Sequence, residues 1–133
     1  MRRYVLDTNI ISDLVRNPTG QVAQRIARVG EQSVCTSIMV AAELRNGSAK
    51  KGSTRLSAQL EAILESLEVL PLGPPVDRVY VDLWLKLEKK GRVIGGNDLL
   101  IAAHTLALGY AFVTDNEREF SGIDSLRVEN WLR

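Results

Sequence analysis

Short apolar runs alternate with amphipathic segments along the chain. The runs predict strands at residues 4–6, 34–36, 68–72 and 111–114, with a candidate fifth strand at 126–129. Between them, apolar side chains recur at the three- and four-residue spacing of helices. This spacing predicts helices at 10–15, 21–29, 38–47 or slightly beyond, 54–67, 76–90 and 99–108, and a short helical turn at 116–120. Residues 50–53 are expected to form a loop.

The order of these elements predicts the class of fold. No two strands are joined by a two-residue hairpin turn, and strands connected through helices pair in parallel with right-handed crossovers. We therefore expect a three-layer α/β/α sandwich with a central parallel sheet of four to five strands. With 133 residues, 45% of them hydrophobic, the chain fits one domain over residues 1–133.

Acidic and amide side chains follow the ends of the predicted strands. Asp7 comes directly after the first strand, and Glu43 lies on the helix after the second. Asp98 is expected to cap the most apolar helix, and Asp115 and Asn116 follow the fourth strand. Ligands of such sheets bind beyond the carboxyl ends of the strands. The topology therefore predicts that these distant residues meet in one pocket.

Two of these carboxylates lack a local countercharge. No Lys or Arg stands three or four residues from Glu43, and Ile101 and Ala102 occupy the corresponding positions for Asp98. Uncompensated carboxylates repel one another unless a cation lies between them. A set of oxygen ligands without Cys or His favours Mg²⁺ or Mn²⁺, and such an ion can activate water for phosphodiester hydrolysis.

Each signal also has an ordinary structural interpretation. Asp7 and Asp98 can serve only as helix caps, and Glu43 can face solvent at the end of its helix. Asp115 and Asn116 can form a plain turn after a strand. The individual residues leave these alternatives open.

Composition narrows the possible partners. Seventeen Lys and Arg stand against sixteen Asp and Glu, so the net charge is +1 and a nucleic acid must be held by local contacts. Lys50, Lys51, Arg55 and Arg92 are candidates for phosphate contacts, but for each one alone a solvated surface role is the expectation. No apolar run is long enough for a signal peptide or a membrane span, so we expect a cytoplasmic protein without membrane contact.

Taken together, four segments make the chain resemble the PIN-domain ribonucleases, and most closely the VapC-type toxins of bacterial toxin–antitoxin pairs. The segments are residues 5–9 (VLDTN), 37–47 (SIMVAAELRNG), 97–104 (NDLLIAAH) and 113–120 (VTDNEREF). They occur in the family's order and approximate spacing and span nearly the whole chain.

The resemblance implies an endoribonuclease that depends on Mg²⁺ or Mn²⁺. Its metal would be held mainly by Asp7 and Asp98, with Glu43 completing an acidic triad. Family members carry Asp or Asn at the second place after the threonine of the last segment, which favours Asn116, with Asp115 as the alternative. The side chains expected to orient the phosphate or the metal ligands are Thr8, Asn9 and Thr114.

The resemblance also implies partners. Proteins similar to VapC commonly form homodimers and are silenced by a small VapB-like antitoxin, and their substrate is RNA. The helix at 54–67 and the helix around Trp84 are the segments expected to make these contacts.

Two other functions compete with this one. A phosphatase or phosphoacceptor domain would use Asp7 as a covalent nucleophile, but Asn9 stands where an Asp-x-Asp phosphatase places its general acid. A catalytically silent PIN-like module would keep the fold only to bind a partner.

Overall fold

The computed structural model describes residues 2–133 and contains a five-stranded sheet in the order β3-β2-β1-β4-β5. The strands are β1 (Tyr4–Leu6), β2 (Val34–Ser37), β3 (Glu68–Leu70), β4 (Ala111–Val113) and β5 (Val128–Glu129). Every neighbouring pair is parallel. The predicted parallel sheet is confirmed, with all five strands present.

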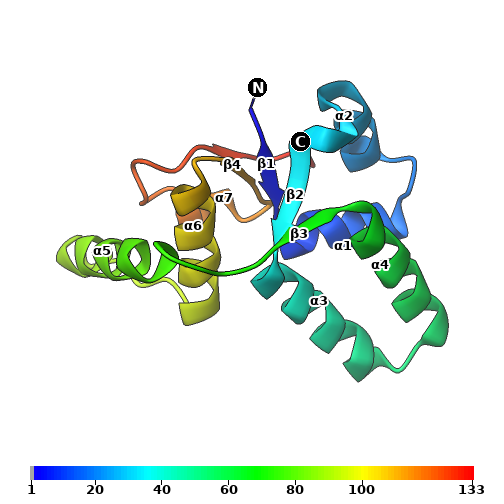
Figure 1. Ribbon diagram of the computed structural model, residues 1–133, viewed down its shortest axis with the longest axis horizontal. Coiled ribbons are helices and arrows are strands. Elements are labelled where there is room, and N and C mark those ends of the chain that lie inside the picture. The colour runs from blue at the N-terminus through cyan, green and yellow to red at the C-terminus, as the bar shows by residue number, and fades with distance from the viewer. Residues whose placement is uncertain (1) are drawn as a thin grey trace.

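Helices cover both faces of the sheet. They are α1 (Thr8–Arg16), α2 (Gln21–Val29), α3 (Ile38–Lys51), α4 (Thr54–Ser66), α5 (Val76–Lys89), α6 (Gly96–Leu108) and α7 (Glu117–Phe120), with a 3₁₀ turn at Glu31–Ser33. Figure 1 shows α5 and α6 on one side of the strands and α1, α2 and α4 on the other. This arrangement is the expected three-layer sandwich.

The direction of the chain reverses at β1. From β1 it proceeds through β2 to β3 at one edge, then returns through α5 and α6 to β4 on the opposite side of β1. Leu6 at the end of β1 pairs with Val113 at the end of β4. In open parallel sheets, ligands bind at this kind of topological switch point, where the strand ends leave a crevice.

The core holds the switch point rigid from both faces. Ile10 and Ile11 of α1 and Ile101 of α6 are fully buried against the sheet. Behind β4, the rings of Phe112 and Phe120 meet edge to face with centroids 4.8 Å apart. Full burial of one such side chain contributes about 1.5–3 kcal/mol to the stability of the fold. This packing holds the residues that follow β1 and β4 in place.

Helix α3 is longer than the sequence pattern indicates, so the loop expected at 50–53 is wrong in its first half. The helix continues to Lys51, and Gly52 ends it in the left-handed conformation with φ 67°. The N–H of Gly52 donates to the carbonyls of Ser48 and Ala49. Lys50 and Lys51 are good helix formers and interact favourably with the negative end of the helix dipole.

The start of α6 also differs from the expectation. The helix begins at Gly96 with Gly95 at the capping position, so Asp98 lies inside the first turn and caps nothing. A carboxylate in the first turn is stabilised by the positive end of the helix dipole without a capping hydrogen bond. The ordinary interpretation of Asp98 as a helix cap is therefore wrong.

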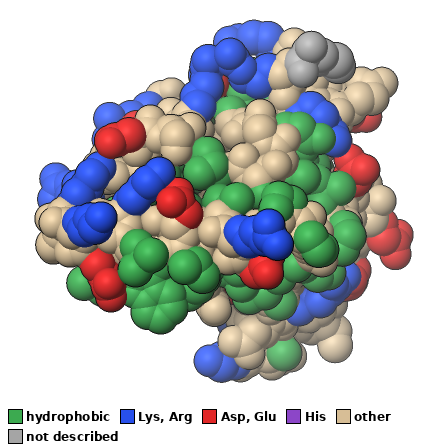
Figure 2. All heavy atoms as spheres, turned by 60° about the vertical axis from the view of Figure 1, so that its left-hand side comes forward, with side chains coloured by type: hydrophobic (Ala, Val, Ile, Leu, Met, Phe, Trp, Pro, Cys, Tyr) green, Lys and Arg blue, Asp and Glu red, His purple; other side chains and the backbone are tan. Residues whose placement is uncertain are grey.

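One face of the surface is unusually apolar. Val81, Trp84 and Leu85 of α5 are about half exposed, and Val93 after the helix is 95% exposed. Figure 2, turned toward the side that carries α5, shows hydrophobic side chains gathered among Lys, Arg, Asp and Glu. Across residues 2–133, every helix is too short or too polar to cross a bilayer.

Candidate active site

Asp7 is fixed at the switch point by hydrogen bonds to the start of α1 and to the end of β4. Its backbone N–H donates to the carbonyl of Val113 (2.9 Å). Its carboxylate accepts from the N–H of Thr8 (2.8 Å) and from the hydroxyl of Thr114 (2.7 Å). Asp7 therefore both caps α1 and presents a carboxylate that β1 and β4 orient together.

The environment of Asp7 disfavours a negative charge. Its side chain is buried, with 6% exposed. Burial raises the pKa of Asp7, and the nearby charges of Asp98 and Glu43 raise it further, against the two hydrogen bonds that lower it. A nearby cation would offset these effects and stabilise the charged form of the Asp7 carboxylate.

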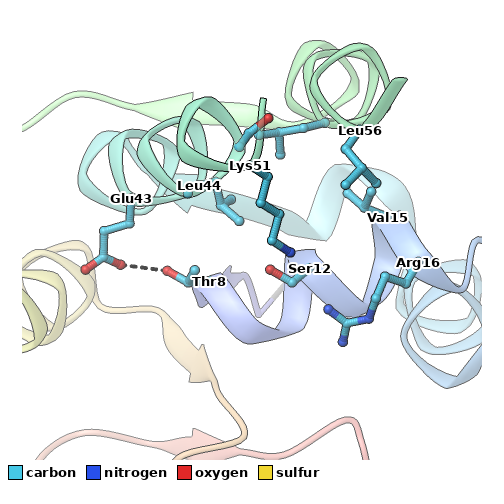
Figure 3. Close-up of a pocket in the computed structure, with 11 residues that line it drawn as sticks. Thr8, Ser12, Val15, Arg16, Glu43, Leu44, Lys51 and Leu56 are labelled. Carbon is cyan, nitrogen blue, oxygen red and sulfur yellow. Dashed lines mark hydrogen bonds between the residues drawn. The ribbon is translucent and has the colours of Figure 1, made fainter. Parts of the chain in front are cut away.

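Glu43 reaches the same place from α3. The hydroxyl of Thr8 donates to its carboxylate oxygen at 2.6 Å, as the dashed line in Figure 3 shows. Thr8 thus contacts one acid through its backbone and another through its side chain. Thr8 therefore lies between the two acids, and the orienting role that the resemblance implies for it stays a prediction.

Asp98 comes from the opposite layer and is half-buried. Burial raises its pKa to about 6, and the hydrogen bond and charge of Glu119 raise it as well. Glu119 lies on α7 and also accepts a hydrogen bond from the side-chain amide of Asn116. Glu119 stands in the segment 113–120 that carries the family resemblance, but no site role is predicted for it there.

The loop after β4 separates the roles of Asp115 and Asn116. The Thr114 hydroxyl accepts from the N–H of Asn116 (3.0 Å), and Asn9 accepts from the N–H of Asp115 (3.1 Å). The Asp115 carboxylate accepts from Asn130 at 3.1 Å. Asn116 lines the acidic cavity, whereas Asp115 does not.

The side chains described so far enclose one cavity of about 400 Å³. Its lining residues are Asp7, Thr8, Asn9, Ser12, Arg16, Glu43, Asp98 and Asn116. The structure thus brings together four of the five predicted acidic or amide residues, which come from four separate elements and loops. Throughout residues 2–133, the ion pairs include none of the three carboxylates that line the cavity.

The lining fits a hard divalent cation in its chemistry, because carboxylate, amide and hydroxyl oxygens dominate it. The carboxylates are spread around the cavity, and among residues 2–133 no three Asp, Glu, His or Cys side chains are grouped as a ready ion site. Glu43 is hydrogen bonded to Thr8, and the pKa of Asp98 is raised by Glu119 beside it. The predicted triad shares one cavity without being packed into one cluster.

Three contributors were not predicted. Ser12 and Arg16 lie one and two turns beyond Thr8, so all three project from one face of α1. That four-residue spacing was the signal that could have found them. Glu119 carries no comparable signal, because only the packing of α7 brings it beside Asp98.

His104 lies outside the cavity. It is 2% exposed, and its Nδ1 lies 2.8 Å from the hydroxyl of Ser37, which also caps α3. Burial lowers the pKa of His104 and keeps the ring neutral. The residue is packed in the interior, and it joins α6 to the start of the helix that carries Glu43.

The fold and the cavity define a class of protein: a parallel α/β domain with an oxygen-lined, acidic site at its switch point. A family model described as the PIN domain matches residues 4–126. Ribonuclease VapC2 of Rickettsia felis is 35% identical over 96% of this chain and 97% of its own length. The chain belongs to the VapC ribonucleases of the PIN-domain family.

Other relatives agree with this assignment. The tRNA(fMet)-specific endonuclease VapC of Shigella flexneri is 30% identical over 98% of this chain and 99% of its own length. Among solved structures, DNA-bound VapBC from Salmonella typhimurium superposes with a TM-score of 0.89 and 30% identity, covering 98% of this chain and 99% of that one. VapBC2 from Rickettsia felis bound to a promoter fragment gives 0.87 and 32%, with 96% and 98% covered.

Proposed function

We propose that this protein is the toxin of a VapBC-type pair, an endoribonuclease that hydrolyses RNA phosphodiester bonds with a divalent metal ion. One observation carries the proposal: Asp7, Glu43, Asp98 and Asn116 converge on one cavity at the switch point, and no ion pair neutralises the three acids. The ion-pair statement covers residues 2–133. VapC relatives named as ribonucleases support the same activity.

PIN-domain nucleases generally depend on a divalent metal ion, and we assign Mg²⁺, with Mn²⁺ as its substitute, to Asp7 and Asp98. Glu43 would complete the acidic set on the α3 side. When bound, such an ion lowers the pKa of water and offsets the charge that builds on the phosphate. The oxygen-only lining favours these hard ions over zinc or copper.

The protein's own groups orient the acids. Thr114 and the N–H of Thr8 hold the two oxygens of Asp7, so its carboxylate has a defined direction. The Thr8 hydroxyl does the same for Glu43. Asn9 fixes the backbone of the loop after β4, and this supports Asn116 as the fourth polar group of the cavity.

The partners follow from the relatives. Solved VapBC complexes from Rickettsia felis and Salmonella typhimurium support a VapB-like antitoxin for this chain. The half-exposed apolar side chains of α5 support a homodimer. Because RNA and antitoxin are cytoplasmic partners, we place the protein in the cytoplasm. Co-purification with the product of the adjacent reading frame tests the antitoxin.

The central experiment is cleavage of RNA by the purified protein with Mg²⁺. Asp98→Asn is expected to abolish cleavage or to reduce it at least about 100-fold, and EDTA is expected to stop it. Asp115→Asn is the matched control. It makes the same chemical change in the loop after β4, at a side chain that does not line the cavity. Cleavage that survives EDTA, or that Asp98→Asn leaves intact, overturns the metal mechanism.

The alternative of an Asp-dependent phosphatase is disfavoured by the surroundings of Asp7. Both carboxylate oxygens are held by hydrogen bonds, and the side chain is buried. Asn9 accepts from the backbone of Asp115 and supplies no acid. A phosphorylated Asp7 trapped with a phosphate donor would restore this alternative.

A further inference from the structure

A groove continues from the acidic cavity into the space between α1, α3 and α4. It has a volume of about 210 Å³ and shares with the cavity the residues Thr8, Ser12, Arg16 and Glu43. Figure 3 shows the Glu43–Thr8 hydrogen bond at one end and Val15 and Leu56 at the other. Because the same side chains line both hollows, a ligand in the groove reaches the carboxylates.

The groove has an apolar floor. Leu44 of α3 and Leu60 of α4 are buried beneath it, and Val15 and Leu56 are half-buried along its wall. A surface of this kind gains free energy by covering the flat face of a base or an apolar side chain.

Two cations stand beside this floor. Arg16 ends α1, Lys51 ends α3, and both are exposed. Figure 3 shows Lys51 reaching across the groove toward Ser12. Neither cation has a carboxylate within 4.0 Å among residues 2–133, whereas Arg45, also on α3, is bound by Glu61 through two hydrogen bonds.

We propose that Arg16 and Lys51 bind phosphates of a single-stranded RNA segment leading into the acidic cavity, and that the apolar floor takes one of its bases. The inference rests on the proposed ribonuclease function and adds the RNA path to it. Single-stranded RNA offers both features at once, since its backbone is anionic and its bases are free to leave the stack.

Charge favours RNA as the occupant of this groove. The whole chain carries a net charge of only +1, and the cavity itself is lined by three carboxylates that repel a phosphate chain. The backbone must therefore be held by cations next to the cavity. Arg16 and Lys51 are the two that line the connected hollows. A protein segment with apolar side chains is the other possible occupant, and the test distinguishes it.

The test measures binding of a fluorescent single-stranded RNA to an Asp7→Asn background, which prevents cleavage, over a range of salt concentrations. Each phosphate contact on a single strand contributes about 0.7 to the slope of log affinity against log salt. Arg16→Ala and Lys51→Ala are each expected to lower the slope by about 0.7, which corresponds to about fivefold weaker binding near 0.1 M salt. Lys50→Ala is the control, since Lys50 is exposed on the same turn but does not line the groove.

A second measurement follows the base. A series of RNAs with one abasic nucleotide, moved along the chain, is expected to show one position where binding weakens. Leu56→Asp is expected to remove that difference. Retention of the penalty in this variant overturns the base site.

The outcomes separate the two proposals. If the parent cleaves RNA but Arg16→Ala and Lys51→Ala bind it as Lys50→Ala does, the groove does not carry RNA. If these variants lose affinity for the antitoxin and keep the parent's salt slope, the groove belongs to the protein partner, which also overturns the inference. If the unsubstituted protein neither binds nor cleaves RNA, the ribonuclease function fails first.

Discussion

The hydroxyl of Thr114 touches two parts of the site at once. It donates to Asp7 at 2.7 Å and accepts from the N–H of Asn116 at 3.0 Å. Groups that orient a metal ligand typically account for 10–100-fold in metal affinity or activity. We expect Thr114→Val to reduce RNA cleavage about 10–100-fold, measured as kcat/KM over a series of Mg²⁺ concentrations.

The conservative variant gives the control. Thr114→Ser keeps the hydroxyl and should retain most of the activity, because Thr114 is fully buried and only one methyl group is lost. If Thr114→Val cleaves as well as Thr114→Ser, the hydrogen bond to Asp7 is unimportant.

Asp98 predicts a pH dependence of stability. Its pKa is raised from an ordinary 3.8 to about 6, so between these values the folded protein holds a proton that the unfolded chain has released. Stability must therefore fall as pH rises through this window. In EDTA the melting temperature is expected to decline from about pH 4 to pH 7, and Asp98→Asn should flatten the decline. An equally steep curve for the variant contradicts the assignment.

A site residue could be predicted from the sequence when the sheet topology alone decides where it lies. Asp7 and Asp98 could be placed because strand ends share one edge of a parallel sheet. The choice between Asp115 and Asn116 could not be made locally, because Asn130 of a distant segment draws Asp115 aside. The place of Glu119 beside Asp98 could not be predicted either, because the two residues lie on different helices, α7 and α6.

At the scale of elements, the periodicity of apolar residues predicted which helices and strands exist better than it predicted the residues at which they begin and end. The helix expected at 21–29 is found as Gln21–Val29, and the strands appear where β-prone runs stand. The differences at the end of α3 and at the start of α6 concern residues outside the spacing of large apolar side chains. Periodicity of apolar residues does not constrain such positions.

The link between α6 and the β2–α3 junction carries a prediction of its own. His104 is buried and hydrogen bonded to Ser37, so its removal leaves a cavity and takes away one of the two hydrogen bonds of the Ser37 hydroxyl. We expect His104→Ala to lower the free energy of unfolding by about 2–4 kcal/mol in urea titrations. Asn97→Ala on the exposed start of the same helix is the control. A loss below about 1 kcal/mol for His104→Ala contradicts this role.

The whole molecule presents its largest exposed apolar side chains on α5 and the loop after it. Val81, Trp84 and Leu85 are each about half exposed. Large apolar side chains grouped on one surface mark association sites. We expect Leu85→Glu to convert a dimer to a monomer in light scattering, while Lys89→Glu, a charge change on the same helix, leaves the dimer intact. A monomeric parent protein contradicts the proposed homodimer.

The Thr114–Asp7 hydrogen bond joins residues that are 107 positions apart. During translation, Asp7 emerges early, but its partner is added only after most of the chain has been made. The site is therefore incomplete until β4 docks beside β1. A partly synthesised chain lacks Thr114, so the Asp7 carboxylate gains its full set of orienting hydrogen bonds only once β4 and the residue after it have been made.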